Sequence, residues 1–218
     1  MNYFAHALPF LDRPYFAAGT GVPDWLTVAD RKVRPRSKHV LPFMEAAEAN
    51  TAAVAGGILQ HLRDDARFHE TRAFVETSLE LTGRVRDLLG AESGFRPHFL
   101  GHFLVEVLLD ASLVAENTGK MEEYYQVLEA VDARVVEAVV NRMAPRPTDR
   151  LAAMIERFCR ERILPDYLED GKLMLRIGQV MRRVKLPQLP GNFAGILPDA
   201  RQLVERRKHE LLEGIPTV

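Results

Sequence analysis

The feature that most constrains the fold is that apolar and polar residues show no sustained period-two alternation anywhere in the chain of 218 residues. Such alternation is typical of a half-buried β-strand, whereas Ala- and Leu-rich segments without proline are typical of helices. The sequence therefore predicts an all-α protein. We expect helices at residues 43–65, 69–89, 98–116, 121–142, 148–163, 166–183 and 199–213.

Prolines and glycines separate these segments. Residues 1–43 are expected to be irregular, because proline disfavours a continuous helix through its position. The prolines of this segment are Pro9, Pro14, Pro23, Pro35 and Pro42. A further break is expected from Ser93 to Pro97. With 47% hydrophobic residues and no internal repeat, the chain is predicted to form one compact helical domain over residues 1–218.

The charge balance and the first residues limit the class of protein. The 29 basic and 30 acidic residues give a net charge of −1, which argues against overall disorder and against nucleic-acid binding by bulk positive charge. No uninterrupted apolar run approaches the roughly 20 residues of a membrane span. Residues 1–10 lack the basic start of a secretory signal. We therefore expect a cytoplasmic protein without a transmembrane segment.

Five basic residues lie close together within the proline-rich N-terminal segment. They are Arg31, Lys32, Arg34, Arg36 and Lys38. Because runs of like charge usually stay hydrated, the first interpretation is a solvated loop, and the second is contact with phosphate or lipid.

Histidines and carboxylates form two ladders with a spacing of four residues. His61, Asp65 and His69 make the first, and successive members advance only about 40° around a helix, so all three can share one face. The second ladder consists of His98, His102, Glu106 and Asp110. On facing helices, the two ladders could supply one pocket.

The second ladder lies in a segment that is apolar on its other sides, which predicts a buried helix. Buried carboxylates need an ionic partner or a cation. Imidazole with carboxylate suits Zn²⁺, Mn²⁺ or Fe²⁺, whereas the single cysteine, Cys159, excludes a multi-thiolate site. The alternative is that the ladders are simple ion pairs between residues four apart.

The N-terminal segment adds two candidates. His6 lies among apolar residues, where it is either a core histidine or a ligand. Asp24 follows Pro23 in a predicted tight turn that aims its carboxylate, or else it caps a helix. The sequence leaves open whether His39 and His98 bind metal. His209 is expected to be a solvated surface residue.

Taken in order, these motifs resemble the bacterial zinc-dependent phospholipase C family. The matching elements are His6, Gly19-Thr20-Gly21-Val22-Pro23-Asp24, His61-Leu62-Arg63-Asp64-Asp65 with His69, and His102-Phe103-Leu104-Val105-Glu106. The opening Met1–His6 and the stretch Gly57–Asp65 are also similar to acyl carrier protein phosphodiesterases, cytoplasmic enzymes that remove the phosphopantetheine arm from a carrier protein. The resemblance covers roughly residues 1–115, and the role of residues 120–218 is open.

Both resemblances imply a phospholipase C-like helical fold and hydrolysis of a phosphodiester by metal-activated water. One to three divalent ions are expected, with Zn²⁺ first and Mn²⁺ or Fe²⁺ as alternatives. The implied ligands are His6, Asp24, His61, Asp65, His69, His102 and Glu106. Asp65 would bridge, and Asp24 or Asp110 would orient or deprotonate the water. The substrate would be a phospholipid, a nucleotide or a phosphopantetheinyl carrier protein.

Other classes of function are weighed against this one. The main alternative is a non-catalytic helical protein with a structural metal or buried His–carboxylate pairs, and with a partner-binding C-terminal half. A di-iron carboxylate bundle is disfavoured because the sequence has no Glu-x-x-His pair. A serine or cysteine hydrolase is disfavoured because no Gly-x-Ser-x-Gly elbow occurs and Cys159 lies in a charged segment.

Overall fold

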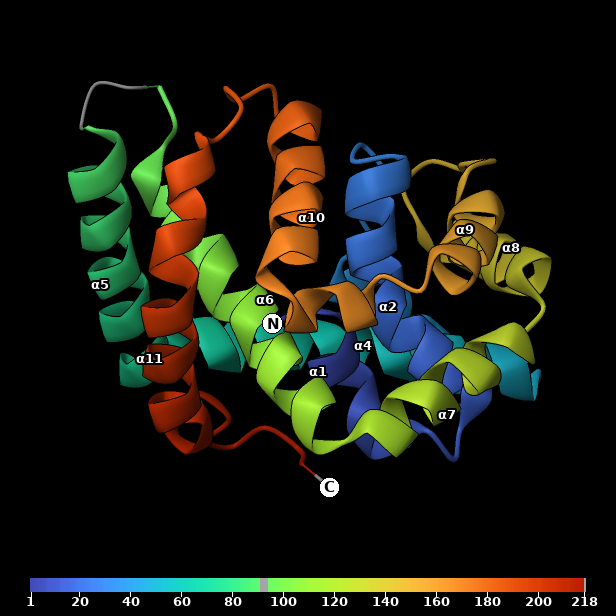
Figure 1. Ribbon diagram of the computed structural model, residues 1–218. Helices are drawn as coiled ribbons and strands as arrows, with labels where there is room; N and C mark the ends of the chain where they lie inside the picture. Colours follow the sequence, from blue (N-terminus) through green and yellow to red (C-terminus); the bar gives the residue numbers. More distant parts are fainter. Residues whose placement is uncertain (91–93, 218) are drawn as a thin grey trace. The chain divides into compact units, whose positions relative to one another are not determined.

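Figure 1 shows the computed structural model, which describes residues 1–90 and 94–217. These residues form helices joined by turns, and no strand occurs among them, so the protein is all-α as predicted. The chain divides into two compact units. Unit 1 comprises Met1, Arg67–Glu116 and Ile163–Ile215, and unit 2 comprises Asn2–Ala66, Asn117–Arg162 and the residues from Pro216.

Each unit combines helices from distant parts of the sequence. Unit 2 contains α1 (Tyr3–Ala7), η1 (Leu8–Phe10), α2 (Pro14–Ala29), α3 (Ser37–Val40), η2 (Leu41–Phe43), most of α4 (Ala49–Glu70), α7 (Thr118–Glu129), α8 (Ala133–Met143) and α9 (Leu151–Glu161). Unit 1 contains the end of α4, α5 (Arg72–Leu89), α6 (Pro97–Glu116), η3 (Leu164–Leu168), α10 (Asp170–Arg183), η4 (Gly191–Ile196) and α11 (Leu197–Leu211).

The N-terminal segment is more helical than its prolines suggested. Pro14 is the first residue of α2, and Pro9 and Pro42 lie in the first turns of η1 and η2. A first turn has no intrahelical acceptor for its N–H groups, so proline costs little there. Pro23, in contrast, lies inside α2, so the tight turn expected before Asp24 is helical instead.

Helix α4 begins and ends later than the expected 43–65, and two further boundaries differ from or refine the prediction. Residues 121–142 form two helices, α7 and α8, because the Asp132 carboxylate caps α8 by accepting hydrogen bonds from the N–H groups of Arg134 and Val135. Before α6, Gly94 and Arg96 have φ values of 74° and 53°. Ser93, where the break was expected to start, lies outside the described residues.

Glycines allow α2 and α4 to approach closely within unit 2. A Cβ atom on Gly57 would lie 2.1 Å from the carbonyl oxygen of Phe16, and one on Gly19 would lie 2.6 Å from that of Val54. Neither distance is sterically possible, so both positions require glycine for this packing. Gly19 therefore serves helix packing rather than a turn.

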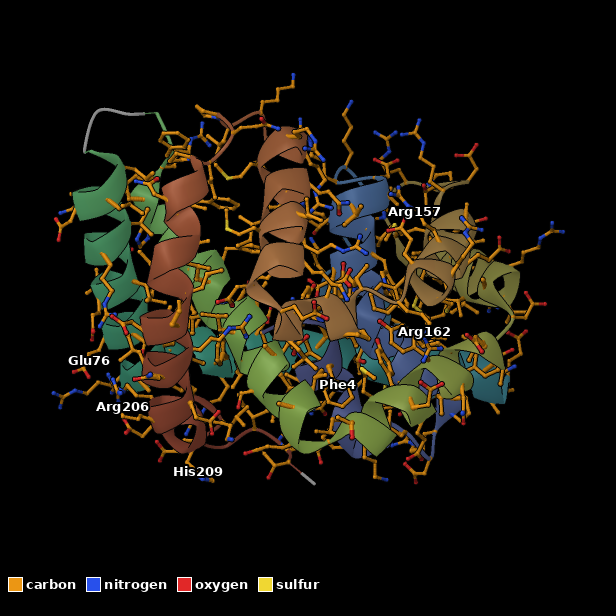
Figure 2. All side chains as sticks on the ribbon, in the orientation of Figure 1. Phe4, Glu76, Arg157, Arg162, Arg206 and His209 are labelled. Carbon is orange, nitrogen blue, oxygen red and sulfur yellow. The ribbon has the colours of Figure 1, made fainter. Side chains whose placement is uncertain are left out.

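The C-terminal half of the sequence completes both units. In unit 2, the Phe158 ring of α9 lies 4.7 Å from Tyr3, 5.6 Å from Trp25 and 5.8 Å from Tyr125. Phe4 is fully buried in the same unit (Figure 2). In unit 1, α5, α6 and α11 lie side by side (Figure 1). Helices from residues 120–217 thus contribute to the core of each unit.

Helix α6 is the most apolar helix of unit 1. Its 20 residues are long and apolar enough, by length and composition, to cross a membrane, and 61% of its most apolar window is buried in the protein. Gly101 brings its backbone against α5, where an added Cβ atom would lie 2.7 Å from the Ser78 carbonyl oxygen. The expectation that the protein has no transmembrane segment stays a prediction.

Candidate metal centres

Two groups of histidine and acidic side chains could each hold a metal ion. Within each group of described residues, one ligand atom per residue lies within 4.8 Å of the others. The group in unit 2 consists of His6, His61 and Asp65, and the group in unit 1 consists of His69, His102 and Glu106. We call them the buried site and the half-exposed site. Each offers two imidazoles and one carboxylate, a donor set that suits Zn²⁺, Fe²⁺ or Mn²⁺.

The buried site is built around both oxygens of one carboxylate. His6 Nε2 lies 3.2 Å from Asp65 Oδ1, and His61 Nε2 lies 3.4 Å from Asp65 Oδ2. The two imidazole rings stack with centroids 4.0 Å apart. His61 and Asp65 face the same way because they are four residues apart on α4, whereas His6 comes from α1.

A backbone carbonyl fixes the orientation of His61. Its Nδ1 donates a hydrogen bond of 2.8 Å to the carbonyl oxygen of Thr20, and since a carbonyl only accepts, Nδ1 carries the proton. In the neutral imidazole, Nε2 then has the lone pair, on the side of Asp65, that metal binding requires. Thr20 lies in the turn of α2 that precedes Pro23, so α2 supplies the acceptor for this histidine of α4.

A second carboxylate, from Asp64, faces the other side of His6. Asp64 Oδ2 lies 3.6 Å from His6 Nδ1, and Asp64 Oδ1 accepts a hydrogen bond of 2.7 Å from Gln60 Nε2. His6 is completely buried, and neither ring nitrogen has a partner at hydrogen-bond geometry. Buried polar atoms without partners are costly, so the two nitrogens of His6 fit a site completed by a cation on the Nε2 side.

The surroundings of Asp65 in the buried site favour its ionised form. Burial raises the pKa of Asp65, but His6 and His61 lower it more, so the pKa of this carboxyl lies well below its usual range. The carboxylate is therefore ready to bind a cation at neutral pH.

The half-exposed site is centred on one oxygen of Glu106. His69 Nε2 lies 3.1 Å and His102 Nε2 lies 3.3 Å from Glu106 Oε1, and the amino group of Met1 donates to the same oxygen at 3.3 Å. His102 and Glu106 are four residues apart on α6, as the second ladder predicts. His69 was expected on the first ladder, with His61, but its ligand atom groups with α6.

Phe74 holds the two imidazoles of this site. Its ring lies edge-on to both, with centroids 4.7 Å from His69 and 4.9 Å from His102. Thr71 begins α5 by accepting a hydrogen bond from the Phe74 N–H at 3.1 Å, which sets the turn between His69 and Phe74. Burial raises the pKa of Glu106, but the amino group of Met1 and the two histidines lower it more, leaving it well below its usual range.

The other sequence candidates lie outside both groups of described ligand atoms. Asp24 is half-buried on α2, and Asp110 is fully buried on α6. His98 is exposed and His39 is half-buried on α3. His209 is exposed near the end of α11, as expected (Figure 2).

Sequence reasoning missed the residues that support the ligands: Thr20, Gln60, Asp64, Thr71 and Phe74. One signal was available, since Thr71 stands three residues before Phe74 at the start of a helical pattern. Burial in unit 2 raises the pKa of the Cys159 thiol to about 11, so the thiol is protonated near neutral pH.

Comparison with known proteins leaves the family open. No protein-family model matches the chain, and no curated protein or solved structure matches it either.

Proposed function

We propose that this protein is a metal-dependent hydrolase that cleaves a phosphodiester with metal-activated water. The observation that carries the proposal is the half-exposed site. Its histidines are partly open to solvent, with 32% of the His69 and 39% of the His102 side chain exposed. Three protein ligands beside an open position are the arrangement of a catalytic site, whereas a structural site is closed by protein.

The residues of the half-exposed site have distinct roles in this proposal. His69, His102 and Glu106 bind the ion, for which Zn²⁺ is the first candidate and Mn²⁺ or Fe²⁺ the alternatives. A bound ion of this kind lowers the pKa of its water toward neutrality. Phe74 packs against both rings on one side and keeps their nitrogens directed toward Glu106. The substrate would approach from the solvent side.

The phosphodiester class of substrate rests on the motif resemblance. The candidate substrates are a phospholipid, a nucleotide and a phosphopantetheinyl carrier protein. The short motifs that carry the resemblance contain all six residues of the two metal groups, namely His6, His61, Asp65, His69, His102 and Glu106.

The buried site favours a second role, that of a structural metal. The His6 and His61 side chains are almost inaccessible to solvent, and their second nitrogens face Asp64 and the Thr20 carbonyl. Enclosed ligands with fixed orientations suit an ion that stays bound. We infer that this site ties α1 to α4 within unit 2 and takes no part in turnover.

The test measures metal content and turnover together. Protein purified without a His tag is analysed for bound metal, and hydrolysis of bis(p-nitrophenyl) phosphate is followed before chelation, after chelation and after Zn²⁺ is restored. His102→Ala removes a ligand, and His209→Ala is the matched control, since it removes an exposed histidine elsewhere in unit 1.

We expect turnover that stops on chelation, returns with Zn²⁺, and is lost in His102→Ala but kept in His209→Ala. Wild-type protein that takes up no metal on titration would contradict both roles. Bound metal without hydrolysis of any candidate substrate would leave the structural role and contradict the enzymatic one.

A further inference from the structure

Among the residues that the structure describes, no acidic side chain forms an ion pair with the basic cluster of unit 2. Its members are Arg31, Lys32, Arg34, Arg36 and Lys38, and all five are exposed. Within the described part of the chain, the side-chain contact found in this segment is a hydrogen bond of 3.1 Å from Arg34 Nε to the Arg31 carbonyl oxygen. Asp30 and Glu45 flank the segment and reduce its charge of +5, and the Asp30 carboxylate accepts a hydrogen bond of 3.2 Å from the backbone N–H of Lys32.

The backbone directs two of these cations to one side. Val33 and Pro35 are buried, whereas Arg34 and Arg36 are exposed. Alternate residues of an extended segment point to opposite sides, so Val33 and Pro35 attach the segment to unit 2 while Arg34 and Arg36 point outward. Arg34 and Arg36 are thus exposed to solvent, while the buried side chains of Val33 and Pro35 hold the segment against unit 2.

Exposed apolar side chains, which form an apolar edge, come directly after the basic cluster in the sequence. Lys38, Leu41 and Met44 are three residues apart across α3 and η2, and residues at this spacing lie on one face of a helix or a 3₁₀ turn. Leu41 is 57% exposed and Met44 is 41% exposed, so both present apolar surface to solvent beside the cations. Cations and large apolar side chains therefore occur together on residues 31–44.

We propose that residues 31–44, the basic–apolar segment, bind the surface of a bilayer that contains anionic phospholipid. Lys and Arg side chains near such a surface are attracted by its negative potential, and adjacent apolar side chains insert at the level of the headgroups. Long cations without fixed partners suit the diffuse charge of a lipid surface, and the apolar edge supplies the second signal that stable attachment needs. The proposal is independent of the metal centres.

The same residues are less suited to other polyanions. Sites for single-stranded nucleic acid combine cations with exposed aromatic rings that stack on bases. The aromatic residue of this segment, Phe43, is half-buried with the Arg142 guanidinium 5.6 Å from its ring centroid. Carboxylates on a protein are best matched by arginines held in a fixed geometry by several contacts. Among the described residues, the contact found for these two arginines is the single hydrogen bond from Arg34 to the Arg31 carbonyl oxygen.

The experiment compares sedimentation with two kinds of vesicle, phosphatidylcholine alone and phosphatidylcholine with about 30% phosphatidylserine. The test variant carries Arg34→Gln, Arg36→Gln and Lys38→Gln. The matched control carries Arg182→Gln, Arg183→Gln and Lys185→Gln, which removes the same charge from an exposed basic run of unit 1. A third variant, Leu41→Ser with Met44→Ser, tests the apolar edge. Circular dichroism confirms that each variant is folded.

We expect wild-type protein to bind the anionic vesicles and to be released by about 1 M salt, which shortens the Debye length to about 3 Å. The test variant should bind about 100-fold more weakly, the apolar variant a few-fold more weakly, and the control like wild type. Three outcomes would overturn the proposal: no binding by the wild type, equal losses in the test and control variants, or binding to an oligonucleotide without binding to vesicles.

Discussion

The buried site and the half-exposed site use the same donors, two imidazoles and one carboxylate, in different surroundings. In unit 2 the two histidines are enclosed and their outer nitrogens face a carboxylate and a backbone carbonyl. In unit 1 the histidines are a third exposed and rest against the edge of one aromatic ring. The ligand set therefore defines which ions fit, and the surroundings define whether water and substrate can reach them.

Loss of one ligand should affect the two units differently, and this is the largest effect expected. Binding contributes about 4 kcal/mol to stability when free metal exceeds Kd about a thousandfold. We expect His61→Ala to lose most of this contribution and to keep turnover, whereas His102→Ala loses turnover and less stability. Chemical denaturation with and without Zn²⁺ measures the first effect, and steady-state kinetics the second. Equal losses of turnover in both variants would remove the distinction between the sites.

The glycine contacts beside each site give the next largest effect. Gly57→Ala places a Cβ atom 2.1 Å from a backbone oxygen, so we expect a loss of about 3 kcal/mol in the free energy of unfolding. Gly101→Ala should cost less, because the nearest backbone atoms, the Ser78 carbonyl oxygen and the Thr82 nitrogen, would lie 2.7 Å from the added Cβ atom rather than 2.1 Å. Gly83→Ala, which meets no atom within 4 Å inside α5, is the control and should stabilise the protein by up to about 1 kcal/mol. Urea denaturation ranks the three, and a neutral Gly57→Ala would contradict the close packing of α2 on α4.

A smaller effect concerns the support of His6. We expect Asp64→Asn to weaken metal binding at the buried site by about 10- to 100-fold, because the amide replaces the carboxylate that faces His6 Nδ1. Titration of the metal-free protein with Zn²⁺ measures the change. Asp87→Asn, on the exposed side of α5, is the control and should bind like wild type. Unchanged affinity in Asp64→Asn would show that Gln60 and Asp64 have no role in orienting the ligand.

The smallest effect is the acid sensitivity of the metal-free protein. The folded-state pKa values of Asp65 and Glu106 lie below their unfolded values of roughly 4. Their contribution to stability is thus complete above about pH 5 and is lost as pH falls through the folded-state values, because the unfolded chain then binds more protons. Asp65→Asn and Glu106→Gln should each flatten this decline in thermal melts between about pH 5 and pH 2. A decline as steep as that of the wild type in either variant would show that its carboxylate is not stabilised in the folded protein.

Local spacing was sufficient to predict part of each site. His61 with Asp65 and His102 with Glu106 are pairs four residues apart on one helix, and in both pairs the side chains meet as the helical period requires. Helix α6 (Pro97–Glu116) agrees with the predicted 98–116, whereas α4 (Ala49–Glu70) begins and ends several residues later than the predicted 43–65. The N-terminal helices were not predicted, because a proline at a first turn and a proline that breaks a helix are identical in sequence.

The third member of each site depended on contacts that local spacing does not determine. His6 reaches the buried site from α1, some fifty residues before its partners, and His69 groups with His102 rather than with its own ladder. The supporting residues Thr20 and Phe74 have no motif of their own, since one acts through its carbonyl and the other through its ring edge.

The sequence by itself determined that this protein is all-α and that histidines and carboxylates would stand four residues apart along two helices, because both properties follow from the helical period. Only the tertiary structure decided how those residues combine into two groups and how much water reaches each. Burial depends on which helices pack together, and in this protein that packing depends on close glycine contacts and on helices from the C-terminal half of the chain.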